Sequence, residues 1–213
     1  MEIGLDDAYS LSSPDDNRKL YAKWAATYES DFVKKQGYRH PQVISEIFHS
    51  NLPPLQSVLD VGAGTGLVGL YLSKLRPNIS IDGIDISPEM LEEARKKNVY
   101  RNLYERDLTN KINDIEAPYD ALITIGTFTH GHLQKDALQN LFPLVKENGF
   151  LVLGVNEKYF YEQNFSDYLQ NMYTEIIYSK SINVYDKTSE HHLSKNVVLI
   201  LRNLKHPSRQ RAD

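Results

Sequence analysis

The sequence predicts an α/β protein in which a parallel sheet is covered by helices on both faces. Two observations support this fold class: short apolar runs bounded by turn residues recur along the chain, and segments with helical periodicity separate them. Strands that alternate with helices pack as a parallel sheet between two helical layers. The expected strands are residues 57–61, 79–85, 102–105, 119–125 and 149–155.

The helices expected between these strands carry apolar residues at positions i, i+3, i+4 and i+7. Two such stripes are Val68, Tyr71, Leu72 and Leu75, and Leu138, Leu141, Phe142 and Val145. A helix is also expected after the second strand, where Ser87 suits an N-cap, Pro88 the first turn and Glu89 the positive end of the helix dipole.

In the last third of the chain, the predicted strands and helices no longer alternate. One more helical stripe consists of Tyr161, Phe165, Tyr168, Leu169 and Met172. Two strand-like runs then follow, at 174–185 and 196–203, with no helix between them. A hairpin at this place would add antiparallel strands to the edge of the sheet.

Four regions are expected along the chain. Residues 1–17 are interpreted as a flexible acidic leader, and residues 18–52 as an N-terminal helical cap. In this cap Tyr21, Trp24, Tyr28 and Phe32 share one helical face, and a second amphipathic helix follows Pro41. Residues 53–204 form the α/β domain, and residues 205–213 a flexible tail.

Composition excludes several classes of function. The formal net charge is −4, which disfavours nucleic-acid partners because these usually need a basic surface. The chain has no cysteine, which excludes disulfides, thiol nucleophiles and cysteine-ligated metals, and no histidine spacing indicates a metal site. There is no signal-peptide pattern and no apolar run of membrane-spanning length. We therefore expect no membrane association and a cytoplasmic location, with the nucleus as the other possibility.

The strongest motif is the turn VLDVGAGTGLVG at residues 58–69, where an apolar strand runs into glycines and then into a helix. Glycines allow a tight turn and let a ligand approach bare backbone, and the following helix start attracts anions. Gly64, Gly66 and Gly69 can be written as the dinucleotide pattern G-x-G-x-x-G, but the first glycine after the strand is Gly62. The pattern G-x-G-x-G therefore describes the turn better. Asp60, in the strand end, would repel a pyrophosphate and suits a cationic amino-acid group.

Carboxylates are expected at the ends of the next two strands. Asp85 ends the second strand, where it could accept hydrogen bonds from both hydroxyls of a ribose. Its rival Asp82, three residues earlier, should lie at the other end of that strand. Asp107 follows the third strand and could accept from an adenine amino group, while Leu108 presents its backbone N–H to the ring. Together these residues indicate a site for an adenosyl ligand.

These segments resemble the class I S-adenosylmethionine-dependent methyltransferases over about residues 20–155. VLDVGAGTG is similar to the first motif of the family, IDGIDISPEML to its ribose-binding segment and ERDLTN to its adenine-side segment. YDALITIG and LFPLVKENGFLVL resemble its fourth strand and the entry to its fifth. The resemblance implies a Rossmann-like fold with a seven-stranded, mostly parallel sheet whose last strand is antiparallel, and S-adenosylmethionine as the cofactor.

The residues expected to contact this cofactor come from the motifs and from the cap. They are Tyr21, Trp24, Tyr28, Asp60, Gly62, Ala63, Gly64, Gly66, Asp85, Ile86, Met90, Asp107, Leu108, Thr124 and Ile125. The aromatic residues of the cap are included because aromatic faces attract a sulfonium cation, although burial in a helix interface would explain them equally well.

Methyl transfer from a sulfonium is an in-line displacement, so the enzyme mainly aligns the acceptor, and a general base helps only when the acceptor is protonated. His130 and His132 both follow the fourth strand, where an acceptor pocket is expected. Of the two, His130 is the favoured candidate for the base. The absence of cysteine and of an Asn- or Asp-Pro-Pro-aromatic motif favours a small-molecule acceptor, with a protein side chain as the other possibility. We expect a monomer or a weak dimer. Two alternative functions stay open: a nicotinamide-dependent oxidoreductase, and a protein that binds the cofactor without catalysis.

Overall fold

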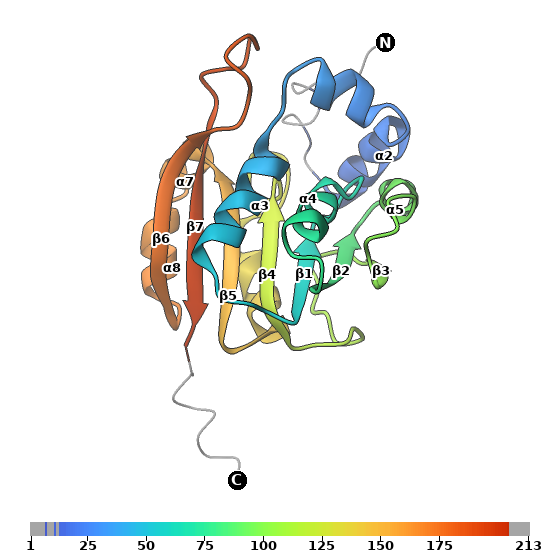
Figure 1. Cartoon of the computed structure of the whole chain (residues 1–213). Helices are drawn as coiled ribbons and strands as arrows, with labels where there is room; N and C mark the ends of the chain where they lie inside the picture. Colours follow the sequence, from blue (N-terminus) through green and yellow to red (C-terminus); the bar gives the residue numbers. More distant parts are fainter. Residues whose placement is uncertain (1–6, 8–10, 12, 205–213) are drawn as a thin grey trace.

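The computed structural model describes residues 7, 11 and 13–204. Its centre is a seven-stranded sheet with the order β3-β2-β1-β4-β5-β7-β6. The strands are β1 (Ser57–Val61), β2 (Ser80–Asp85), β3 (Asn102–Glu105), β4 (Tyr119–Ile125), β5 (Val145–Asn156), β6 (Thr174–Asn183) and β7 (Lys195–Asn203). The pairs among β1 to β5 are parallel, whereas β7 is antiparallel to both β5 and β6, and its arrow points the opposite way from β4 in Figure 1. The predicted fold class is confirmed.

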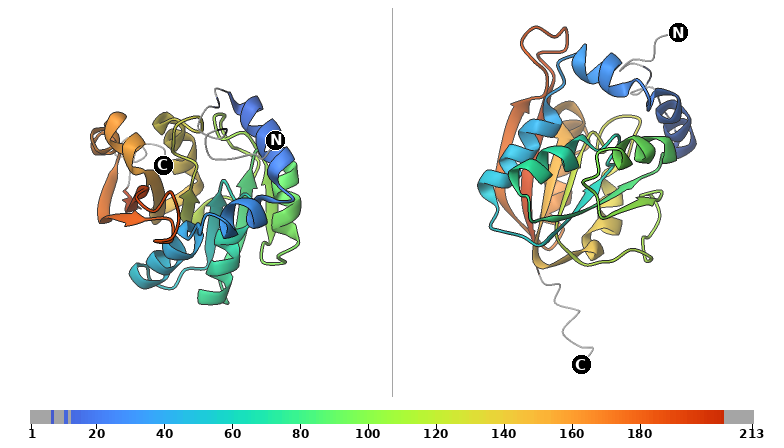
Figure 2. Two further views of the ribbon diagram at one scale, coloured as in Figure 1. Left: turned by 90° about the horizontal axis from the view of Figure 1, so that it is seen from above. Right: turned by 45° about the vertical axis from the view of Figure 1, so that its right-hand side comes forward.

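Helices cover both faces of this sheet, as the two views of Figure 2 show. One face is covered by α3 (His40–Asn51) and α4 (Leu67–Leu75), whose side chains Ile44, Phe48 and Leu72 pack on the strands. The other face is covered by α6 (Leu138–Leu141), α7 (Glu157–Glu162) and α8 (Phe165–Gln170). Because both faces are buried, the central strands are apolar on each side; all but one residue of β1 is buried, for example.

The N-terminal segment crosses the top of the sheet in Figure 1, beside the carboxyl ends of the parallel strands. It contains α2 (Pro14–Trp24) and the π-helical turn η1 (Tyr28–Lys34), and α5 (Pro88–Arg95) lies next to α2. Ion pairs connect α2 and η1 to the domain: Arg18 with Glu105 at 2.9 Å, and Glu29 with Lys97 at 2.6 Å. Lys97 also donates to the backbone oxygen of Thr65, in the glycine turn.

The structure corrects three details of the predicted elements. Helix α2 begins at Pro14, so the last residues of the expected leader are helical; Ser13 caps this helix by accepting from the backbone N–H of Asp16. The rest of the leader, apart from residues 7 and 11, and the tail 205–213 lie outside the described residues. Val145 starts β5 instead of ending a helix, because α6 is short and is followed by the 3₁₀ turn η3 (Phe142–Leu144). The stripe from Tyr161 to Met172 is divided between α7 and α8 by a left-handed residue, Asn164.

Within the described part of the chain, none of the helices has the length and apolar character that a membrane span needs.

Candidate functional site

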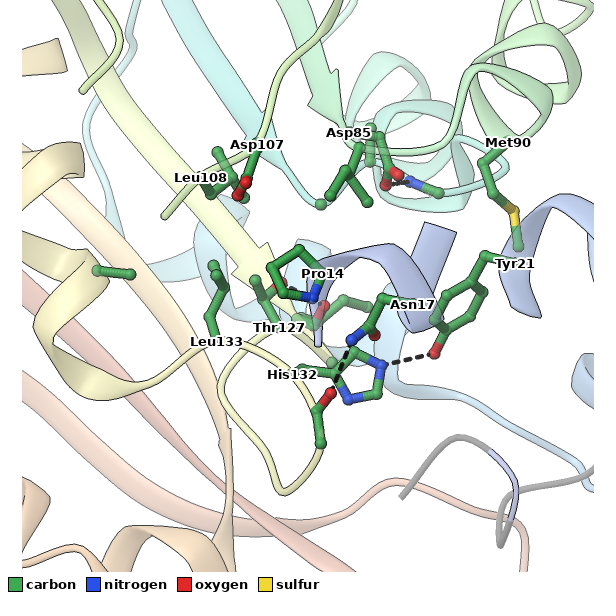
Figure 3. Close-up of a pocket in the computed structure, with 18 of the residues that line it drawn as sticks. Pro14, Asn17, Tyr21, Asp85, Met90, Asp107, Leu108, Thr127, His132 and Leu133 are labelled. Carbon is green, nitrogen blue, oxygen red and sulfur yellow. Dashed lines mark hydrogen bonds between the residues drawn. The ribbon is translucent and has the colours of Figure 1, made fainter. Parts of the chain in front are cut away.

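A cavity of about 680 Å³ opens at the carboxyl ends of β1, β2 and β4. Its wall consists of the glycine turn after β1, the end of β2, residues 107–109, the loop after β4 and the inner face of α2. In an open α/β sheet, ligands bind where the strand order reverses, and this chain reverses between β1 and β4. Figure 3 shows Asp85, Asp107 and Leu108 on one side of the cavity and Pro14, Asn17 and His132 on the other.

The glycine turn has the geometry that the sequence predicted. Gly62, Gly64 and Gly66 all have positive φ, at 70°, 54° and 86°. At Gly64 the nearest heavy atom to an added Cβ would be 4.0 Å away, so the backbone there faces open space in the cavity wall. At Gly62 the space is instead filled by Thr127, whose Oγ1 would lie 2.7 Å from a Cβ. Gly64 is therefore where a ligand can reach bare backbone.

Asp85 fixes this turn to the end of β2. One carboxylate oxygen accepts the backbone N–H of Gly64 at 2.8 Å, and the other accepts that of Ser87 at 2.9 Å. Burial raises the pKa of Asp85, although both backbone hydrogen bonds favour the charged form. Each oxygen keeps acceptor capacity for a further donor. Asp85 thus combines a structural role in the turn with a carboxylate at the cavity wall.

Asp107 also lies at the cavity wall, and its carboxylate organises a turn. One oxygen accepts the N–H and the hydroxyl of Thr109 at 2.9 and 2.7 Å, and the other accepts from Asn110 at 3.1 Å. Leu108 is buried beside it, and its carbonyl accepts from Asn140. Ala63, Ile86, Met90 and Ile125 line the same cavity.

Asp60 and Gly66, which the sequence also predicted to contact the ligand, lie behind the wall. Asp60 is buried and accepts a hydrogen bond from the hydroxyl of Tyr100 at 2.6 Å, while that hydroxyl accepts the backbone N–H of Gly69. A Cβ at Gly66 would lie 2.9 Å from the Tyr100 ring, and one at Gly69 2.4 Å from it. These positions are small or polar because they hold Tyr100 against α4. Sequence reasoning could not foresee this, since Tyr100 is 40 residues from Asp60 along the chain.

We expect Asp60 to give the protein a specific pH dependence of stability. Burial raises its pKa from 3.8 to about 7. Between these values the folded protein keeps the proton that the unfolded chain releases, so stability should fall as the pH rises from about 4 to about 7, and then level off. At about 1.4 kcal/mol per pKa unit, the loss is on the order of 4 kcal/mol.

Denaturant unfolding of the wild type and of Asp60→Asn across this pH range measures the effect. The free energy of unfolding of the wild type should fall relative to that of the variant as the pH rises, because asparagine does not ionise. A difference that stays constant from pH 4 to pH 8 would show that Asp60 is not the group responsible.

The three aromatic residues predicted in the cap have different positions. Tyr21 and Tyr28 line the cavity, whereas Trp24 is 3% exposed and packs against Tyr21, Tyr28 and Phe32. Trp24 faces only a smaller adjoining cavity of about 70 Å³. Thr124 is also buried behind the wall, where its hydroxyl donates to Thr127 at 2.6 Å.

Of the two histidines after β4, the structure places the less favoured one at the cavity. His130 points away from it, forms a 2.7 Å contact with Glu162 and packs on the ring of Tyr159. His132 lines the cavity, and its Nε2 is 2.9 Å from the hydroxyl of Tyr21 (Figure 3). The loop turns at Gly131, which has a φ of 77°, and this turn directs the two rings to opposite sides. The prediction that His130 is the base is therefore wrong, because His130 does not line the cavity.

Sequence reasoning missed the start of α2, where Pro14 and Asn17 line the cavity. The signal was present: Ser13, Pro14 and Asp15 repeat the N-cap, proline and acidic-turn pattern that was recognised at Ser87. Thr127 and Leu133 line the cavity as well, from the loop after β4. Among the described residues, no group of three or more His, Asp or Glu side chains is arranged to hold a metal ion.

Comparison with known proteins agrees with this geometry. A family model described as a methyltransferase domain matches residues 59–151, which include the glycine turn, Asp85 and Asp107. Over these residues the chain resembles a methyltransferase domain. The dinucleotide interpretation of Gly64, Gly66 and Gly69 is set aside because Gly69 lies inside α4.

Individual methyltransferase relatives are distant. Malonyl-[acyl-carrier protein] O-methyltransferase 1 of Ilyobacter polytropus is 27% identical over 175 residues, which cover 80% of this chain and 62% of that protein. The chain therefore spans less than two thirds of the length of this curated relative. The solved plantazolicin methyltransferase BpumL in complex with SAH has a TM-score of 0.56 at 18% identity, covering 90% of this chain and 91% of that one. The [4+2]-cyclase SpnF has a TM-score of 0.70 at 13% identity, covering 92% and 98%. At these identities the solved methyltransferase and the cyclase support the fold alone.

The residues present fit S-adenosylmethionine. Gly64 leaves space for a ligand against the main chain, and the adjoining helix start of α4 suits its carboxylate. Asp85 offers acceptors at the end of β2, and Tyr21 and Tyr28 of the cap line the same cavity. The bound cofactor supplies an electrophilic methyl group on a sulfonium.

Proposed function

We propose that the protein transfers the methyl group of S-adenosylmethionine to a small-molecule acceptor. The observation that carries the proposal is the cavity of about 680 Å³ that extends from the glycine turn and Asp85 to the tyrosines of the cap. One part of its wall has the groups that the adenosyl ligand needs, and the remainder leaves room for a second molecule. Residues of α2 and η1 form part of the same wall.

Within this cavity the protein's own residues would align the acceptor and exclude water. Asp85 would hold the ribose hydroxyls, Asp107 and Leu108 the adenine side, and Gly62, Ala63 and Gly64 the amino-acid part. Tyr21 and Tyr28 would shield the reacting centre from above. Orientation of the two reactants in a closed site supplies most of the rate enhancement that such a displacement needs.

The finer identity of the protein is also a proposal. The segments YAKWAATYESDF, IDISPEMLEEARKKNVYRNLYERDL and ITIG resemble methyltransferase-like protein 27, and this resemblance supports methyl transfer without naming the acceptor. We propose a cytoplasmic or nuclear location and a monomer or weak dimer, in keeping with the acidic balance of the chain.

The test is product formation from labelled cofactor. The purified protein is incubated with methyl-labelled S-adenosylmethionine and a fractionated metabolite extract, and labelled products are detected by mass spectrometry. A labelled small molecule that requires the protein supports the proposal. Binding of the cofactor without any labelled product would instead support a binding protein, and label found only on proteins would replace the small-molecule acceptor with a protein one.

A further inference from the structure

We infer that the acceptor is an uncharged molecule with an acidic hydroxyl of the phenol kind, and that Nε2 of His132 takes the proton from that hydroxyl. This inference rests on the proposed function and adds the class of acceptor and the base. It follows from the charge of the cavity wall, the hydrogen bonds of His132 and the aromatic surfaces beside it.

The wall of the cavity is acidic. Asp85, Asp107 and Asp136 line it, and no lysine or arginine among residues 13–204 does so. A carboxylate acceptor, such as the free acid of a malonyl group, would find no lysine or arginine side chain on this wall to pair it. Asn17 adds a further acceptor, since its Oδ1 is buried and has no hydrogen-bond partner in the described structure. The wall therefore favours a neutral molecule that donates hydrogen bonds.

The hydrogen bonds of His132 define which nitrogen can act as a base. Its Nδ1 lies 3.2 Å from the backbone oxygen of His130, and a carbonyl oxygen only accepts, so Nδ1 carries the hydrogen. Burial lowers the pKa of His132, so the ring is neutral near pH 7 and Nε2 has a lone pair. That lone pair accepts the hydroxyl hydrogen of Tyr21 at 2.9 Å. An acceptor hydroxyl that reaches this position would replace the Tyr21 hydroxyl on Nε2.

A base of this strength selects among hydroxyl compounds. A phenol such as tyrosine has a pKa of about 10, whereas water has one of about 15.7 and aliphatic alcohols resemble water. Transfer from a phenol to a neutral imidazole is therefore far less unfavourable than transfer from an alcohol, and it becomes favourable as the oxygen forms its new bond.

The surfaces beside His132 suit a planar molecule. Tyr21, Tyr28 and Tyr38 line the cavity, and the ring of Tyr21 lies 5.7 Å from that of His132 between centroids. The smaller adjoining cavity shares these three tyrosines and is also lined by Trp24 and Phe32. Aromatic side chains pack well on a planar ring, through offset or edge-to-face contacts.

The acceptor oxygen bonds to the methyl carbon while Nε2 of His132 takes its hydrogen as a proton. The bond from that carbon to sulfur breaks, and its electron pair stays on the sulfur as S-adenosylhomocysteine. The products are the methyl ether, S-adenosylhomocysteine and a protonated His132, which returns its proton to water when the products leave.

The experiment measures binding as well as transfer. The protein, saturated with S-adenosylhomocysteine and labelled with ¹⁵N-histidine, is titrated with phenols that carry methyl, propyl or phenyl at the para position. Each phenol is compared with the benzoate that carries the same substituent. Calorimetry gives the affinities, and the imidazole nitrogen resonances, assigned with His132→Gln, report contact at Nε2. Ether formation from S-adenosylmethionine is then measured for wild type, His132→Gln and the matched control His130→Gln.

We expect at least one phenol to bind roughly tenfold or more tightly than its benzoate, to shift the His132 Nε2 resonance and to be methylated. His132→Gln should lose most of this methylation while it keeps its affinity for S-adenosylhomocysteine, and His130→Gln should behave as wild type. The inference is overturned if S-adenosylhomocysteine binds but no phenol does, if benzoates bind as well as phenols, or if His132→Gln methylates at the wild-type rate. If the wild-type protein does not bind S-adenosylhomocysteine, the proposed function itself is refuted.

Discussion

Alanine in place of Asp82 is expected to lower the free energy of unfolding by about 3 kcal/mol. Asp82 is fully buried and accepts four hydrogen bonds: two from Arg101, at 3.0 and 2.6 Å, one from the hydroxyl of Tyr119 at 2.7 Å, and one from the backbone of Asn102 at 3.0 Å. Its loss leaves the buried hydroxyl of Tyr119 without this partner. Arg101 is partly exposed and can turn to water, which limits the cost.

Denaturant unfolding of Asp82→Ala measures this loss, and Asp114→Ala is the matched control. Asp114 also pairs with an arginine, Arg106, but at an exposed position, so its replacement should cost less than about 1 kcal/mol. Affinity for S-adenosylhomocysteine should be unchanged in both stably folded variants, because Asp82 lies three residues before Asp85 on β2 and does not line the cavity. Equal stability losses in the two variants would show that the buried network does not stabilise the sheet.

Asp85→Ala, in contrast to Asp82→Ala, should lower the affinity for S-adenosylhomocysteine, by about 100-fold. The variant loses two charge-assisted hydrogen bonds to the ribose, each contributing about 1.5 kcal/mol, and 1.4 kcal/mol corresponds to a factor of ten. The backbone N–H groups of Gly64 and Ser87 lose their acceptor as well. Gly64 lines the cavity, where water can replace it, whereas Ser87 is fully buried.

Calorimetry provides the affinities, and Asp136→Ala controls for the change in charge. Asp136 lines the same cavity from an exposed position, so its removal should alter the affinity by no more than a few-fold. A similar affinity for wild type and Asp85→Ala would exclude Asp85 as a ligand of the cofactor.

The strands and their direction could be predicted because a strand buried on both faces is a short apolar run, and the turn glycines mark where it ends. For the same reason Asp85 could be assigned to the carboxyl end of β2. Asp82, expected at the other end, lies inside the strand, which begins at Ser80. The pattern was less informative where a helix is only one turn long, which is why Val145 was assigned to a helix instead of to β5.

The site was predictable where a residue's role depends on its place at a strand end, and not where it depends on a distant partner. Gly64, Asp85 and Asp107 line the cavity because the sheet brings the ends of β1, β2 and β3 together. Asp60 lies behind the wall because Tyr100 covers it. His132 lines the cavity whereas His130 contacts Glu162, and their spacing in the sequence does not reveal this difference.

Hydrogen–deuterium exchange of the wild-type protein with and without S-adenosylhomocysteine tests the central claim most directly. If the glycine turn, Asp85 and the cap enclose the ligand, backbone amides at 62–67, 85–90 and 107–109 should exchange more slowly when it is present, and so should those of α2. Protection confined to other regions, such as β6 and β7, or no change at saturating ligand, would contradict the assignment of this cavity to the cofactor.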